Sequence, residues 1–357
     1  MSSGGLQRRR VAGGGSSGAT SQGSNNESSP NNSQFNGSGG SRHGSASPAV
    51  GSSEDRKVAY DPQDINNTAD ELRQPKFTLM EEVLLMGLKD RQGYLSFWND
   101  NISYALRGCI LMELAFRGKI AMVNDPVRRR LPLSDRYVEV IDDKITGEAL
   151  LDETIKIMKT SEPLSIGTWI DYLSGETWNL TKISFQLKQV RERLAKGLVD
   201  KGVLRTEKRN FFLFDMATHP VTDTQVKDEI KRRVITLLTA RTCVLGPTPY
   251  FPEDVPFRYL RSIALVGGSY AANVLENALS TLGYDARDNA FARADEILGD
   301  YSEWPFISRS ASEHSTGVGV NLSTVIADEV AAYPDKALQI EIIAAVFSVY
   351  AKLDAIM

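Results

Sequence analysis

The chain has 357 residues, of which 41% are hydrophobic and 24% charged, as is ordinary for a globular protein. Its net charge of −4 provides no general attraction to nucleic acid or acidic lipid, so any anion site must be a local group of cations. The lone cysteines Cys109 and Cys243 form neither a disulfide framework nor a zinc site. They favour a reducing, cytosolic setting; because the chain opens without a secretory signal and its most apolar late stretch, 340–351, is too short to span a bilayer, we expect a soluble or peripheral protein.

Residues 1–55 are dominated by Gly, Ser and Asn and cannot bury enough apolar surface to fold, so we expect a disordered tail. Its basic tip, Arg8-Arg9-Arg10, is either a compact contact for an acidic partner or membrane surface, or part of a solubilising tail. Residues 56–75 are interpreted as a linker and 76–357 as the folded domain.

The folded domain begins with a capping-box pattern. Thr78 and Glu81 are spaced to bind each other's backbone amides at the start of an apolar helix that stops at Gly93. The elements expected next are a strand at 94–98, a helix at 102–117, strands at 120–123 and 137–141 around a basic turn at 128–132, and helices at 147–159 and 165–173.

The stretch from Ser184 to Met216 predicts a helix followed by a hairpin. Four apolar residues recur at helical spacing and Gly202 ends the helix; they are Leu187, Val190, Leu194 and Leu198. A strand then starts at Val203, Lys208–Asn210 form a polar turn, and the Phe-rich run 211–214 is the return strand.

Later helices are expected at 222–239, 257–282, 286–298 and 338–353. Those at 257–282 and 338–353 are too apolar to face water, and Gly267-Gly268 inside the first favours close packing. The fold class is therefore mainly α: a compact helical domain with buried central helices surrounded by amphipathic ones, plus short β-hairpins.

Cations flank the apolar stripe of the predicted 184–202 helix. At about 100° per residue, Arg191 lies roughly 40° and Lys188 roughly 100° from Leu187. A ledge of a planar guanidinium and a mobile ammonium suits a phosphate. The alternative is that both cations pair with Glu192 or Asp200.

Signals of catalysis are mostly missing, so we expect neither an enzyme nor a bound metal or cofactor. His219 and His314 are the only histidines of the folded region, and they do not form a metal-spaced pair. Two binding functions remain open. One is a winged-helix nucleic-acid binder whose wing carries Arg205, Lys208 and Arg209; the other is a membrane-headgroup site on the cation ledge.

Five segments closely resemble the Golgi phosphoprotein 3 family. They are TLMEEVLL from Thr78, GYLSFWND from Gly93, LSGETWN from Leu173, VRERLAK from Val190 and NFFLFDM from Asn210. The likeness covers roughly residues 76–355, and the runs are long enough to be highly specific. The stretches LQRRRV from Leu6 and KVAYDP from Lys57 resemble its fungal members, of the vacuolar-protein-sorting type.

The resemblance implies a peripheral protein on the cytosolic face of the Golgi that binds phosphatidylinositol 4-phosphate. It also implies retention of glycosyltransferases by their cytoplasmic tails and their transfer to the coatomer of retrograde vesicles. The family's headgroup pocket falls on Trp98, Arg107, Lys188 and Arg191. Lys188 stands where some relatives have arginine, so the charge is kept but the planar fork is lost. We expect no nucleic-acid partner.

The resemblance also assigns self-association to a hairpin corresponding to residues 207–218. We therefore expect a homo-oligomer such as a tetramer, with the hairpin contributing Glu207, Phe211, Phe212, Leu213, Phe214 and Thr218. Strand alternation would place Phe211 and Leu213 on one face and the other two apolar residues on the opposite face. For Arg8, Arg9 and Arg10 we expect contact with coatomer.

Overall fold

The computed structural model describes residues 74–95, 101–177, 180–211, 214–306 and 321–354, all within one compact unit, Tyr60–Met357. The helices are α2 (Leu79–Gly87), α3 (Asn101–Phe116), α4 (Ala149–Lys159), α5 (Ile166–Ser174), α6 (Val190–Asp200), α7 (Thr224–Thr239), α8 (Arg258–Ala271), α9 (Leu275–Leu279), α10 (Tyr284–Asp300), α11 (Leu322–Ala331) and α12 (Ala337–Asp354). The strands are β1 (Ile120–Met122), β2 (Tyr137–Val140), β3 (Leu164–Ser165), β4 (Glu207–Phe211) and β5 (Phe214–Thr218). Short 3-10 helices are η1 (Pro126–Arg130), η2 (Leu133–Asp135), η3 (Leu180–Phe185) and η4 (Pro334–Lys336).

The predicted mainly α class is confirmed, whereas the predicted tail and nearly all of the linker lie outside the described residues.

Helix α2 begins with the predicted capping box. The Thr78 hydroxyl accepts from the amide of Glu81, whose carboxylate in turn accepts from the amide of Thr78 at 2.8 Å. Lys201, which follows α6, binds the same carboxylate at 2.7 Å, so the start of α2 is tied to the end of α6. The helix ends at Gly87 and not at the predicted Gly93, which instead turns the chain with a φ of 69°.

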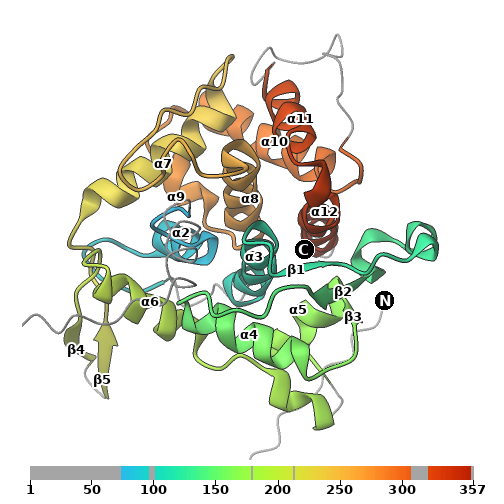
Figure 1. The fold of residues 1–357 in the computed structure, drawn as a ribbon. Coiled ribbons are helices and arrows are strands. Elements are labelled where there is room, and N and C mark those ends of the chain that lie inside the picture. Colours follow the sequence, from blue (N-terminus) through green and yellow to red (C-terminus); the bar gives the residue numbers. More distant parts are fainter. Residues whose placement is uncertain (1–73, 96–100, 178–179, 212–213, 307–320, 355–357) are drawn as a thin grey trace, which may run out of the picture. The chain divides into compact units, whose positions relative to one another are not determined.

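Helices α3, α8 and α12 pack together at the centre of the unit, with α2 beside them (Figure 1). Glycines permit this close approach. A Cβ added at Gly267 would lie 2.5 Å from Cζ of Phe347, and one at Gly268 would lie 2.8 Å from Sγ of Cys109. The prediction of close packing at this glycine pair is confirmed, as is the prediction that the two most apolar helices form the core.

Several predicted boundaries were wrong. The helix expected over 257–282 is divided into α8 and α9, because the chain turns at Asn273 with a φ of 52°. The cap of α7 is Asp223 and not Thr222, since the Asp223 carboxylate accepts from the amide of Gln225. Tyr94 and Leu95 are not in a strand, and the rest of the strand predicted there lies outside the described residues. Helix α11 and strand β3 were not predicted.

The two predicted strands around the basic turn do pair. Strands β1 and β2 are antiparallel with Ile120 opposite Val140, and β3 adds a third strand to β2. The basic turn between them forms η1, where Arg128 binds the buried carboxylate of Glu341 on α12 at 3.3 Å. Arg136 binds the same carboxylate at 2.7 Å, so this small sheet is anchored to the last helix.

A fully buried carboxylate joins the central helices. Glu113 of α3 accepts from Arg117 at 2.8 Å, from Arg261 of α8 at 3.2 Å and from the amide of Leu79 at 3.1 Å. Burial alone would raise the pKa of Glu113, but Arg261 and Arg117 together lower it to about 2. The ionised carboxylate therefore links α2, α3 and α8 at neutral pH.

Candidate anion-binding site

The candidate site lies where the chain returns from α5 to α6. The amide of Leu187 donates to the carbonyl of Leu173 at 3.0 Å, so the two ends of the 174–186 loop meet. Helix α6 starts at Val190, after Gln189 in the left-handed conformation with a φ of 53°, and the Gln189 side chain does not cap it. The first amides of α6 therefore lack a side-chain cap, which leaves the positive end of the helix dipole open to an anion.

Lys188 and Arg191 stand at this end of α6, and both are exposed. Among the described residues, neither side chain has an ion pair or a hydrogen bond. Arg193, on the same helix, differs because it binds Glu153 at 2.6 Å. An exposed cation without a carboxylate partner is the kind of group that a phosphate can recruit.

The predicted placement of Lys188 on the helix was wrong. Helix α6 begins only at Val190, so Lys188 lies in the turn before it. The predicted helical angles of Lys188 and Arg191 from Leu187 therefore do not apply, because Leu187 and Lys188 are not in the helix. The four apolar residues of the predicted stripe are nevertheless all buried. In the described residues, neither Lys188 nor Arg191 pairs with Glu192 or Asp200, which was the alternative to a phosphate ledge.

Arg107 of α3 is buried next to the turn before α6, and it joins the two residues that flank the 174–186 loop. Its Nε donates to the carbonyl of Leu173 at 3.2 Å, one terminal nitrogen to that of Leu187 at 2.9 Å, and the other to that of Ser103 at 2.7 Å. Burial and the nearby charge of Arg191 lower the pKa of Arg107 to about 10, which leaves it a cation at neutral pH. No carboxylate in the described part of the chain forms an ion pair with it.

The structure thus brings together three of the four residues predicted for a headgroup pocket: Arg107, Lys188 and Arg191. Trp98, the fourth, lies outside the described residues. Arg8, Arg9 and Arg10, predicted to contact coatomer, also lie outside them.

The predicted hairpin is present, but its turn was placed wrongly. Strands β4 and β5 pair from Glu207 opposite Thr218 to Phe211 opposite Phe214, so residues 208–210 lie in a strand and do not form the turn. Residues 208–210 lie within β4. Phe211 is the last residue of β4 and Phe214 the first of β5, so the two residues do not share one return strand. The side chains of Phe211, Phe212, Leu213 and Phe214 lie outside the described residues, so their predicted faces stay a prediction.

The cations of this hairpin are paired with carboxylates. Arg205 and Arg209 lie 2.7 and 3.7 Å from the two oxygens of Glu207, and Lys208 lies 3.2 Å from Asp215 across the hairpin. A wing that grips nucleic-acid phosphates needs free cations. The pairing therefore disfavours the winged-helix interpretation.

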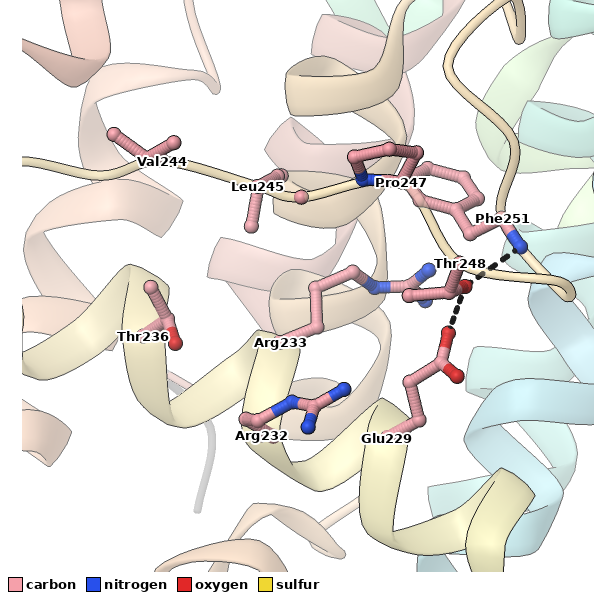
Figure 2. Close-up of a pocket in the computed structure, with 10 residues that line it drawn as sticks. Glu229, Arg232, Arg233, Thr236, Val244, Leu245, Pro247, Thr248 and Phe251 are labelled. Atoms are coloured by element: carbon pink, nitrogen blue, oxygen red, sulfur yellow. Dashed lines mark hydrogen bonds between the residues drawn. The ribbon is translucent and has the colours of Figure 1, made fainter.

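A second concave site, between α7 and the segment 244–251, was not found from the sequence (Figure 2). It encloses about 240 Å³ and is lined by Glu229, Arg232, Arg233, Thr236, Val244, Leu245, Gly246, Pro247, Thr248 and Phe251. In the sequence, only the adjacent arginines Arg232 and Arg233 could have indicated this site, because its lining comes from two separate segments.

The charges inside this second site are largely engaged. Arg233 binds Glu82 of α2 at 2.5 Å, and its guanidinium lies 4.3 Å from the ring centre of Phe251. The Thr248 hydroxyl donates to Glu229, as Figure 2 shows. These contacts fix the 244–251 segment onto α7, which leaves the turn before α6 as the better anion site.

The described residues hold no group of three or more His, Cys, Asp or Glu side chains placed to bind a metal ion. His219 is half-buried, and burial lowers its pKa. In the same part of the chain, no helix combines the length and the apolar character needed to cross a membrane.

The fold and the site define a mainly helical domain with exposed cations at the start of α6, which have no partner among the described residues and suit an anionic ligand. The chain matches the model of the Golgi phosphoprotein 3 (GPP34) family over residues 79–314, and it belongs to that family, as the sequence predicted. It is 53% identical over 356 residues to vacuolar protein sorting-associated protein 74 of Schizosaccharomyces pombe. The aligned region covers 99% of this chain and 100% of that protein. A protein of the same name from Eremothecium gossypii is 56% identical over 301 residues, 84% of this chain and 90% of that protein.

Proposed function

We propose that this protein is a peripheral Golgi adaptor that binds phosphatidylinositol 4-phosphate at the turn before α6. Family membership supports a Golgi-associated role, and the names of both relatives connect those proteins with vacuolar protein sorting. The observation that carries the proposal is that Lys188 and Arg191 are exposed, have no partner in the described part of the chain and lie near the buried cation Arg107.

The chemistry of the turn suits a phosphomonoester on a membrane. Arg191 offers a planar fork of donors, Lys188 a mobile ammonium, and the uncapped amides of α6 a partial positive charge. Arg107 uses its donors on three carbonyls, so its part is to hold the turn in shape and to add positive potential. Each basic residue near an anionic leaflet contributes about 1 kcal/mol, so a single site binds weakly and reversibly.

Liposome flotation tests this site. Wild-type protein should float with phosphatidylcholine vesicles only when they contain phosphatidylinositol 4-phosphate. Lys188→Ala with Arg191→Ala should abolish this flotation and leave thermal melting nearly unchanged, because both side chains are exposed and neither forms a hydrogen bond or an ion pair in the described part of the fold. Lys196→Ala with Arg232→Ala removes two exposed cations elsewhere and should float as wild type does. Unchanged flotation of the Lys188 and Arg191 variant would rule out this site.

The adaptor role adds three kinds of protein partner: glycosyltransferase cytoplasmic tails, coatomer and further copies of this chain. The tail Arg8-Arg9-Arg10 offers coatomer a compact basic contact. Changing the three arginines to alanine should weaken coatomer pull-down without reducing vesicle binding. Equal recovery of coatomer by the variant would leave the tail with a solubilising role only.

Self-association through residues 207–218 would place several headgroup sites on one membrane-facing surface and turn weak contacts into avid binding. The main competing function, nucleic-acid binding, predicts a salt-dependent shift of duplex DNA at physiological ionic strength. We expect none, because Arg205 and the cations of β4 are paired with carboxylates.

A further inference from the structure

The loop between α5 and α6 is closed at its base by the same contacts that shape the anion site. The residues that flank it are joined by the backbone bond from Leu187 to Leu173, and Arg107 donates to the carbonyl of each. The base of the loop is therefore held beside Lys188, which follows Leu187 directly in the chain. Helix η3 ends at Phe185, three residues before Lys188, so it is next to the turn before α6 in the chain.

One side of the loop packs inward. Within it, η3 ends at Phe185, whose ring stacks on Trp169 of α5 with centroids 6.0 Å apart and meets Tyr172 edge-on at the same distance. Lys182 Nζ lies 4.8 Å from the centre of the Phe185 ring. These contacts fix which side of η3 faces the domain.

The other side of η3 presents two large aliphatic side chains to solvent. Leu180 is 80% exposed and Ile183 is 42% exposed. Residues three apart lie directly above each other on a 3-10 helix, so the two side chains share one side. Single exposed aliphatic residues are common, but this pair is followed in the chain by Lys188 and Arg191, two exposed cations without a partner among the described residues.

We propose that Leu180 and Ile183 enter the interfacial region of the bilayer when the turn before α6 binds its lipid headgroup. This inference rests on the proposed function and adds the surface that the membrane contacts. Aliphatic side chains beside cations are typical of segments that lie about 5–10 Å into the boundary between headgroups and acyl chains. An anionic leaflet fits both halves of this surface, because the cations meet phosphates while the aliphatic pair leaves water.

The test separates insertion from headgroup recognition. Leu180→Asn with Ile183→Asn should weaken binding to phosphatidylcholine vesicles containing phosphatidylinositol 4-phosphate roughly tenfold, as expected for partial burial of two aliphatic side chains. Calorimetric binding of soluble inositol 1,4-bisphosphate should stay at the wild-type value. Ile145→Asn with Val244→Asn, which also changes two exposed aliphatic residues, should bind vesicles as wild type does.

A fluorophore sensitive to polarity, attached at Leu180→Cys, gives a second measurement. The native Cys109 and Cys243 are buried, so labelling is selective for position 180. Its emission should shift to the blue with these vesicles and stay constant with the soluble headgroup.

Wild-type vesicle affinity of the Leu180 and Ile183 variant, or an unshifted label on bound protein, would overturn the insertion while leaving the headgroup site intact. An equal loss in the Ile145 and Val244 variant would also overturn it. If wild-type protein binds neither vesicles nor soluble headgroup, the proposed function itself fails.

Discussion

Replacing Arg107 by methionine should destabilise the domain, whereas replacing the two exposed cations should not. The guanidinium makes three hydrogen bonds to backbone carbonyls of 2.7, 2.9 and 3.2 Å, two of which close the loop before α6. Bonds from a charged donor contribute about 1.5–3 kcal/mol each. The cost of burying the cation, which also lowers the pKa of Arg107 to about 10, offsets part of this gain. We therefore expect a net loss of about 2–4 kcal/mol in the free energy of unfolding.

Urea unfolding at neutral pH, followed by far-UV circular dichroism, measures this loss. Arg191→Met and Lys188→Met are matched controls, because each removes an exposed cation with no bond in the described part of the fold. Each should change the free energy of unfolding by less than about 0.5 kcal/mol. If Arg107→Met unfolds at the same urea concentration as wild type, the carbonyl bridge does not stabilise the fold and the reasoning is wrong.

Three further changes test other parts of the structure. Gly267→Ala should lower the free energy of unfolding by about 1–3 kcal/mol, because the new Cβ would lie 2.5 Å from Phe347, whereas Gly299→Ala meets no atom within 4 Å and should not lower it. Glu113→Gln should be less stable than wild type at pH 7; because the folded-state pKa of Glu113 is lowered to about 2, this difference should narrow as the pH of unfolding experiments falls from about 4.5 towards 2. Deleting residues 207–218 should give monomers in analytical ultracentrifugation with most helix content retained, and sedimentation like wild type would refute the role of the hairpin in self-association.

The sequence predicted those features of the fold that depend on neighbouring residues or on the composition of one segment. The capping box at Thr78 depends on residues three apart, and the core role of α8 and α12 follows from their apolar composition. The residue at which α6 starts could not be predicted from neighbouring residues. Gln189 adopts a positive φ while the chain around it is held by Leu173 and Arg107, which lie far away in the sequence. Apolar spacing continued through that break and predicted one uninterrupted helix.

The hairpin turn was misplaced for a related reason. Three consecutive polar residues, Lys208–Asn210, resemble a turn, but an exposed strand accepts them when they find partners across the hairpin. Asp215 accepts from Asn210 at 3.0 Å and pairs with Lys208 at 3.2 Å. The candidate site was more accessible to sequence reasoning, since Arg191 and Lys188 were chosen for their residue types. That they have no partner in the described part of the chain could be seen only in the structure.

The inward Arg107 and the outward Lys188 and Arg191 experience different natural selection. A substitution at either exposed cation changes the surface charge while nearly all molecules stay folded, so at the proposed anion site selection would act on ligand recognition alone. A substitution at Arg107 first reduces the amount of folded protein, whatever its effect on binding. Under the proposed function, the exposed residues could therefore change one at a time towards a different anionic ligand, while substitution of the buried arginine would be opposed by the loss of folded protein.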